Sequence, residues 1–160
     1  MPRYARVMPN AAAPLADPPQ LEQFIVAWER FARAARRARG RANQAPSGQL
    51  THAQYLLVEP LLEQAPVPIC QLAEAAAVAQ PTATRMLGGL ERDGVVRRHA
   101  DVDDRRIALI ELTADGRALA EEKRAQLMTV RAQIFASIPE PQRAQAAELL
   151  DRLAVAVERL

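Results

Sequence analysis

A chain of 160 residues is long enough to form one domain with a core of its own. Aromatic residues make up only 4% of it, so that core must be built from Leu, Val, Ile and Ala. No segment approaches the roughly 20 apolar residues of a membrane span, and the start lacks the charged-then-apolar pattern of a signal peptide, so we expect no membrane partner.

The net charge is only +2, but the basic residues are unusual because Lys123 is the only lysine among 21 of them. Arginine binds phosphate and guanine edges bidentately, which suits nucleic acid, although a GC-rich genome also favours arginine codons. We therefore expect the placement of the arginines, and not the total charge, to indicate the partner.

Cys70 is the single cysteine, so no internal disulfide can form, which fits a reducing cytoplasm and predicts a cytoplasmic protein. At the start of an amphipathic helix, it is either a small packing residue or a redox sensor.

Residues 1–20 contain five prolines and no periodicity, which predicts a disordered or extended arm. From Leu21 onward, apolar side chains recur at helical spacing and predict a helix over residues 21–40. The C-terminal half of this helix carries a run of arginines, which either complement the helix dipole or face phosphate.

Thr51 and Gln54 have the spacing of a capping box and predict the start of the next helix. Pro60 falls inside that helical pattern, so we expect a kink or an early end there. Pro68 is predicted to be the first residue of the following helix.

Two short helices, over residues 69–76 and 80–92, are predicted to flank a tight turn at Ala77 and Val78. The second helix has one apolar stripe, which contains Ala83, Met86, Leu87 and Leu90. Helical geometry places small, polar and basic residues on its other face, namely Pro81, Thr82, Arg85, Gly88, Gly89 and Arg92. This outward face has no acidic residue before Glu91, so it can approach an anionic groove without repulsion.

Gly94 signals the end of this helix, and two apolar strands follow over residues 95–98 and 107–112, joined by an Asp/Arg loop. Thr113 is predicted to cap a long helix, which Pro139 and Pro141 end, and a last helix runs from about residue 142 to the end. The predicted fold is mainly α with a small two- to three-stranded β wing, that is, a helix-turn-helix followed by a wing.

The segments LAEAAAVAQPTATRMLGGLERDGVVRR, DVDDRR and LTADGRAL together resemble the MarR family of winged helix-turn-helix transcriptional regulators. The resemblance covers roughly residues 50–119. It implies a single domain over 21–160, with a winged helix-turn-helix over about 50–113 and dimerisation helices over about 21–40, 113–137 and 140–160. It also implies a homodimer that represses transcription from a pseudo-palindromic DNA site. The wide apolar stripes of the three flanking helices support the dimer, because the small winged core cannot cover all of them.

By the same resemblance, the second short helix enters the major groove and the wing reaches the neighbouring minor groove. Arg106 falls at the wing arginine of the family, and Asp104 at the acid that holds it by an ion pair. The complete predicted set of DNA-contacting residues is Gln80, Thr82, Thr84, Arg85, Arg97, Asp104, Arg105 and Arg106.

The chain departs from the family pattern in the helix-turn-helix. Ala79 stands where a capping Ser, Thr or Asp is usual, and Ala77 replaces a turn glycine. Gly88 and Gly89 replace longer polar or basic residues, which removes possible phosphate contacts and loosens the helix. These changes bear on affinity and base choice, and not on the fold.

Many members of the family release DNA when a small aromatic or phenolic acid binds. If this holds here, the candidate lining residues are Trp28, Arg30, Phe31, His52 and Tyr55, although an ordinary core position is the favoured interpretation for Trp28, Phe31 and Tyr55. The sequence has no phosphate loop, no nucleophile elbow and no tight metal-ligand spacing, so we expect no enzyme, cofactor or metal site. The rival interpretation is a dimeric winged-helix module that binds another protein and has weak or no affinity for DNA.

Overall fold

The computed structural model describes residues 18–102 and 104–159. Residues 1–17 of the predicted N-terminal arm, Asp103 and Leu160 lie outside the described residues. The chain divides into two compact units with a boundary between Ala42 and Asn43, and each is described by itself. None of the helices is both long enough and apolar enough to cross a membrane, within the residues that the structure describes.

In the first unit, α1 (Pro18–Ala42) is a single continuous helix. The predicted bounds were too narrow at both ends. Pro18 and Pro19 belong to the first turn instead of the arm, because proline is tolerated where the N–H groups have no helical acceptor. At the other end the helix continues through Gly40. Among the described residues, no side chain of α1 is buried within the chain.

The second unit begins with α2 (His52–Val58), which the predicted capping box does start: Thr51 Oγ1 accepts from Gln54 N, and Gln54 Oε1 accepts from Thr51 N. The early end expected at Pro60 is confirmed, since α2 stops at Val58 and continues as a 3₁₀ turn, η1 (Glu59–Leu62). Pro68 does not start a helix. It lies in the short strand β1 (Val67–Pro68) and caps α3 (Ile69–Ala75) in extended conformation.

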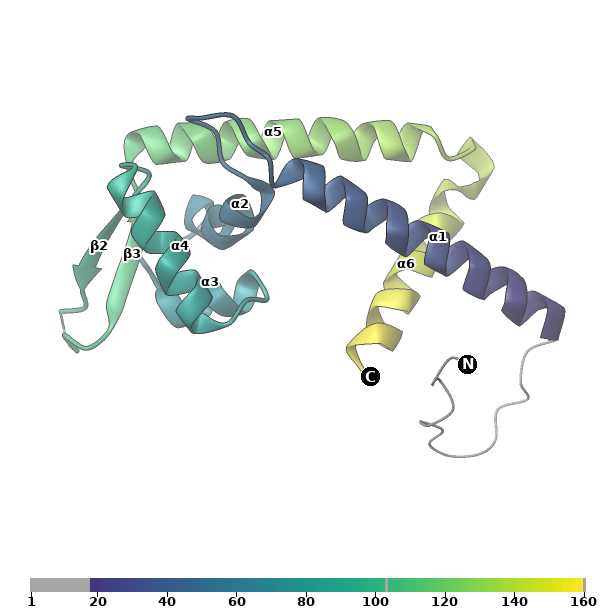
Figure 1. The fold of residues 1–160 in the computed structure, drawn as a ribbon, viewed down its shortest axis with the longest axis horizontal. Helices are drawn as coiled ribbons and strands as arrows, with labels where there is room; N and C mark the ends of the chain where they lie inside the picture. The colour runs from purple at the N-terminus through teal and green to yellow at the C-terminus, as the bar shows by residue number, and fades with distance from the viewer. Residues whose placement is uncertain (1–17, 103, 160) are drawn as a thin grey trace. The chain divides into compact units, whose positions relative to one another are not determined.

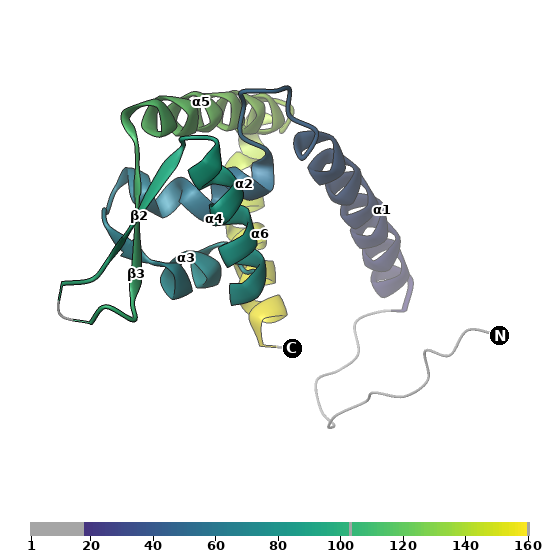
Figure 2. The ribbon, with the colours of Figure 1, turned by 60° about the vertical axis from the view of Figure 1, so that its left-hand side comes forward.

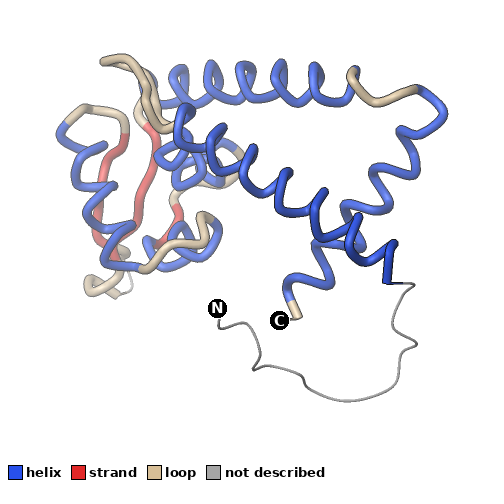
Figure 3. The backbone as a smooth tube through the Cα atoms, turned by 45° about the vertical axis from the view of Figure 1, so that its right-hand side comes forward, coloured by secondary structure: helices blue, strands red, loops and turns tan. Residues whose placement is uncertain are grey.

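The helix-turn-helix consists of α3 and α4 (Gln80–Arg92), and the predicted bounds of α4 are confirmed. The strands β2 (Val96–Ala100) and β3 (Ala108–Leu112) follow it. The three strands form an antiparallel sheet in the order β1–β3–β2, with Val67 opposite Ile110 and Arg98 also opposite Ile110. Figure 3 shows this small sheet beside the short helices of the unit.

The core of the second unit is contributed by α2, η1, α3, α4 and the sheet, which we call the winged lobe (residues 43–112). Leu57, Leu72, Leu87 and Ile110 come from four of these elements and are completely buried. In Figure 2 the short helices and the strands gather around this centre. The predicted apolar stripe of α4 is therefore confirmed as its buried face, except that Met86 is only partly buried.

Two longer helices complete the unit: α5 (Ala114–Ala136) and α6 (Arg143–Glu158), separated by the 3₁₀ turn η2 (Glu140–Gln142). The first half of α5 packs on the winged lobe through Gly116 and Ala120, which are buried. Figure 1 shows α5 extending away from the lobe and the chain turning back at η2 into α6. Arg143 holds this corner, because its guanidinium lies 4.8 Å from the Phe135 ring centre and its Nε donates to Ile138 O.

Candidate nucleic-acid interface

The helix α4 has one buried face and one exposed face. Ala83, Leu87 and Leu90 are buried in the lobe, so the helical repeat directs Thr84 and Arg85 to solvent. Thr84 Oγ1 donates to the Gln80 carbonyl at 3.0 Å, which fixes the orientation of this side chain on the exposed face. Ala79 supplies no side-chain cap, as expected from the sequence.

The turn that orients α4 is held by backbone hydrogen bonds at the end of α3. Val78 N donates to Ala73 O at 3.0 Å and Ala77 N donates to Glu74 O at 2.9 Å, the two bonds of a Schellman motif. This motif needs a residue in the left-handed region, and Ala77 occupies it with φ +52°. The corresponding motif at the end of α4 has a glycine, Gly94, with φ +73°. The turn therefore forms without the usual glycine, at the cost of a strained alanine.

The wing is the β2–β3 hairpin together with its loop. Backbone bonds close the loop from Asp101 N to Ile107 O at 3.0 Å and from Ile107 N to Asp104 O at 2.9 Å. Asp101 Oδ1 also accepts from Asp104 N at 3.0 Å. These three bonds join Asp101, Asp104 and Ile107 within the loop.

The ion pair between Asp104 and Arg106 that the resemblance implied is present, and it is bidentate. Arg106 Nε donates to Asp104 Oδ1 at 3.0 Å, and Arg106 Nη2 donates to Oδ2 at 3.1 Å. The hydrogen bonds from the Arg106 side chain and backbone lower the pKa of Asp104, and the same carboxylate raises the pKa of Arg106. The Arg106 side chain is 91% exposed. A guanidinium held on one edge keeps its other N–H donors available for an anion.

The other two predicted wing arginines lie on β2 and in the loop. Arg97 is exposed on β2, and the Nε of the neighbouring Arg98 lies 3.6 Å from Glu91 Oε2 on α4. Arg105 is exposed in the loop. The structure therefore brings exposed Arg85, Arg97, Arg105 and Arg106 into one unit, on α4 and on the wing that follows it.

Apart from the Thr113 helix cap, the contacts between the wing and α5 were not predicted from the sequence. Thr113 Oγ1 accepts from Gly116 N at 2.9 Å, which confirms the cap, and also donates to the Gly94 carbonyl at 2.7 Å. Gly116 lies so close to the α4–β2 corner that a Cβ atom there would overlap Val95 O. Gly116 in the segment TADG is the sequence feature that could have indicated this close approach. Its contact with Val95 is long-range, however, and the spacing of residues along the chain does not reveal it.

Two arginines of α5 attach it to η1. Arg117 donates to the carbonyls of Leu62 and Leu61 at 3.1 and 3.3 Å, and Arg124 Nη1 lies 2.8 Å from Glu63 Oε1. Sequence reasoning missed both, because each contact spans more than 50 residues. They hold the first half of α5 on the winged lobe.

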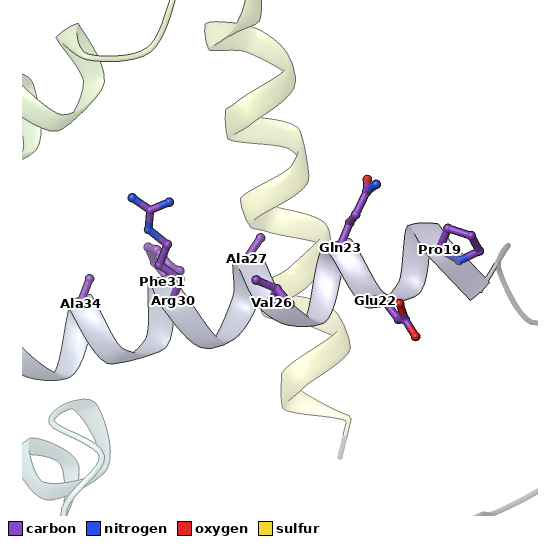
Figure 4. A pocket seen from close by; sticks show the side chains of 8 residues that line it. All are labelled: Pro19, Glu22, Gln23, Val26, Ala27, Arg30, Phe31 and Ala34. Atoms are coloured by element: carbon purple, nitrogen blue, oxygen red, sulfur yellow. The ribbon is translucent and has the colours of Figure 1, made fainter.

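The candidate effector residues separate into two groups. Arg30 and Phe31 line an open hollow of about 750 Å³ along α1, together with Pro19, Glu22, Gln23, Val26, Ala27 and Ala34 (Figure 4). Trp28 does not line it; its ring stacks on Phe24 with a centroid separation of 6.2 Å.

The structure places Tyr55, one of the candidate effector-lining residues, in the core of the winged lobe. Its side chain is 1% exposed in the core of the winged lobe, and its hydroxyl donates to Glu59 Oε1 at 2.9 Å. Burial, and then the bond to Glu59, raise the pKa of Tyr55 to about 12. His52, three residues earlier, is half-buried. Tyr55 is thus a core residue, as the alternative interpretation held.

Comparison with known proteins places this chain in a family. A family model described as the MarR family matches residues 50–108. The homoprotocatechuate degradative operon repressor of Escherichia coli is 32% identical over 102 residues, which cover 64% of this chain and 69% of the repressor.

Several solved structures have the same fold as this chain. BpsR of Bordetella bronchiseptica, in a structure concerned with regulation of its DNA binding by 6-hydroxynicotinic acid, has a TM-score of 0.66 and 25% identity over 80% of this chain and 98% of that one. A probable transcriptional regulator from Pseudomonas aeruginosa has a TM-score of 0.65 and 30% identity over 77% and 93%. Streptococcus pneumoniae FabT in complex with DNA, with a TM-score of 0.69 over 89% and 99% but 18% identity, shows the same fold.

The protein belongs to the MarR family, and it is a winged-helix transcriptional regulator, not an enzyme.

Proposed function

We propose that the protein is a repressor that binds a pseudo-palindromic operator as a homodimer and releases it when a small aromatic acid binds. The observation that carries the DNA-binding part is the Asp104–Arg106 pair, because it directs an exposed guanidinium from the tip of the wing. A narrow minor groove concentrates negative potential and attracts arginine, so such a residue suits the groove beside the major-groove contact of α4.

The predicted contacts divide into two roles. Arg85, exposed on α4, is the candidate for reading a guanine, and Thr82 and Thr84 flank it on the same helix together with Gln80. Arg97, Arg105 and Arg106 of the wing are candidates for phosphate and minor-groove contacts, with Asp104 as the residue that orients Arg106.

The dimer is supported by apolar side chains that the single chain leaves exposed on its long helices. They are Phe24, Ile25, Val26 and Phe31 on α1, Met128, Val130, Ile134 and Phe135 on α5, and Leu149, Leu150, Val155 and Val157 on α6. Apolar surface of this extent is typical of an interface. A two-fold dimer spaces its recognition helices about 34–36 Å apart, which matches successive turns of a duplex.

The repressor role and the aromatic effector are supported by two relatives. One is named as the repressor of a homoprotocatechuate degradative operon, and the other is regulated in its DNA binding by 6-hydroxynicotinic acid. In this chain Arg30 and Phe31, which line the hollow on α1, offer a cation and an aromatic wall to such an acid.

Selection of bound duplexes from a random pool, followed by titration at several salt concentrations, tests the proposal. We expect a two-fold symmetric site whose affinity falls log-linearly with salt, and Arg85→Ala to weaken it by about 1–3 kcal/mol. Arg106→Ala should reduce the salt slope by about one phosphate equivalent. Asp104→Ala should weaken binding and keep the slope, because it removes the orientation and not the cation. Arg152→Ala on α6 is the matched control.

Duplex binding no tighter than that of an unrelated protein of the same pI would contradict the proposal and favour the protein-interaction module. Repeating the titration with aromatic acids tests the effector separately, since the expected result is release of the selected duplex by an acid and not by its uncharged amide.

A further inference from the structure

The exposed face of α4 carries a second arginine whose position the structure defines. A Cβ atom built on Gly88 would lie 4.0 Å from Nη1 of Arg92, and one built on Gly89 would lie 3.9 Å from its Nη2. The guanidinium of Arg92 therefore folds back along the helix and lies over the bare backbone of these two glycines.

Arg92 shares this face with Arg85. Seven residues make almost two helical turns, so the two side chains have nearly the same direction and are about 10 Å apart along the axis. Gly88 and Gly89 lie between them, and both have small exposed surfaces without a side chain. Along this face, Arg85 and Arg92 are therefore separated by the uncovered backbone of Gly88 and Gly89.

The neighbouring charges leave the Arg92 cation uncompensated. Arg92 has two adjacent carboxylates: Glu91 is directed to the wing, where it pairs with Arg98 at 3.6 Å, and Asp93 makes no ion pair with Arg92. Arg92 itself makes no ion pair within residues 18–102 and 104–159. Its cation is therefore available to an external anion.

The charge of the whole unit shows why such a cation matters. Residues 43–160 contain 13 Lys and Arg against 16 Asp and Glu, so the unit that carries α4 and the wing has a net charge of −3. Attraction to a polyanion must come from local arginines, because the unit as a whole repels it.

We propose that Arg92 binds a phosphate of the duplex and that Gly88 and Gly89 exist to let it lie on the groove-facing side of α4. A glycine pair also allows the helix backbone to approach the duplex closely. Longer side chains at positions 88 and 89 would contact phosphate themselves. Here Arg92, one turn further along the helix, makes that contact instead. This inference rests on the proposed DNA-binding function.

The test is the salt dependence of duplex binding, measured with the selected operator and with a scrambled duplex. Arg92→Gln should reduce the log–log salt slope by about 0.9 on both duplexes, because a phosphate contact is independent of sequence. Arg92→Lys should keep the slope, since the charge remains. The thermal midpoint of each variant is measured in parallel, because an arginine that only complements the helix dipole would change stability and leave the slope unaltered.

A second variant tests the role of the glycines. Gly89→Leu places an uncharged side chain where the guanidinium lies, so it should lower the slope as Arg92→Gln does, and the double variant should lower it no further. A wild-type slope in Arg92→Gln overturns the phosphate contact while leaving the proposed function intact, and a wild-type slope in Gly89→Leu overturns the role of the glycines. Absence of duplex binding by the wild-type protein would instead overturn the proposed function, and this inference with it.

Discussion

The winged lobe and the long helices contain apolar side chains of the same kinds but bury them very differently. In the lobe, Leu57, Leu61, Leu72, Leu87 and Ile110 are all completely buried. In α1 and α6, by contrast, no residue is buried within the described chain, and Phe31 on α1 remains 60% exposed. The lobe can therefore fold around its own core, whereas the helices need a further surface to cover them.

The two regions should also respond differently to substitution. A buried position responds to a single added or removed methyl group, because protein interiors are close-packed. An exposed apolar helix face responds only when the surface that covers it is lost. Substitutions in the lobe should therefore change the unfolding of the protein, and those on the helices should change its association.

The largest effect is expected where α5 meets the lobe. Gly116→Ala makes the new Cβ atom overlap the Val95 carbonyl, so the backbone must shift, and we expect a loss of about 3 kcal/mol in the free energy of unfolding. Urea denaturation measures it. The matched control is Gly88→Ala, where the new Cβ meets only the Arg92 side chain at 4.0 Å. That variant should gain about 0.5–1 kcal/mol from helix propensity, and equal stabilities of the two variants would contradict the predicted contact.

The next effect concerns association through α5. Ile134 is 61% exposed in the single chain, so Ile134→Glu should weaken the proposed dimer at least about 100-fold, or about 2.7 kcal/mol. Sedimentation equilibrium measures it. Thr129→Glu adds the same charge about 100° or more around α5 from each of its exposed apolar side chains and serves as the control. A wild-type protein that stays monomeric at micromolar concentration, or equal masses for the two variants, would refute the interface.

A smaller effect is expected in the core of the lobe. Tyr55→Phe removes the hydrogen bond to Glu59 and should cost about 1 kcal/mol at neutral pH. The pKa of Tyr55 is raised from 10.0 to about 12, so the protonated phenol favours the folded state. The stability that it contributes is complete below pH 10 and is lost as the pH rises through 12.

Unfolding measured between pH 9 and 12 checks this linkage, and absorbance at the tyrosinate band in a Tyr4→Phe background reports Tyr55 alone. Tyr55→Phe should flatten the alkaline decline in stability. Titration of Tyr55 near pH 10 in the folded protein would contradict this prediction.

The smallest effect is a gain. Ala77 has φ +52° in the turn of the helix-turn-helix, a conformation that costs an alanine about 1–2 kcal/mol and a glycine almost nothing. Part of the gain from Ala77→Gly is offset by the greater freedom of glycine in the unfolded chain, which leaves about 0.5–1 kcal/mol of net stabilisation. Ala76→Gly, at the neighbouring residue with φ −82°, should instead destabilise by a similar amount. Thermal midpoints with the same sign for both variants would count against the strain.

Much of the winged lobe was predictable because its signals are local. The bounds of α4, the caps at Thr51 and Thr113 and the stop at Gly94 all depend on residues within a few positions of one another. The Asp104–Arg106 pair was implied by the family resemblance and is present, since it too joins residues two apart. The roles of the eight predicted DNA-contacting residues remain predictions.

The errors arose where distant segments decide a residue's surroundings. For Tyr55 the sequence left two interpretations open, an effector site or the core, and the helices packed around it place it in the core. Pro68 was assigned to a helix because its fixed φ suits a first turn, but pairing with Leu109 places it in a strand. The position of Arg92 over the two glycines was likewise not expected.

The amino-acid sequence by itself determined the order of the α-helices and of the two wing strands, most of their caps, and the family, since periodicity and capping act over a few residues. Only the tertiary structure decided which apolar side chains are enclosed and which stay exposed, where α5 meets the lobe at Gly116, and how the Arg92 guanidinium lies. Burial and long-range contact depend on segments that are close in space and far apart in the chain, and no local pattern contains that information.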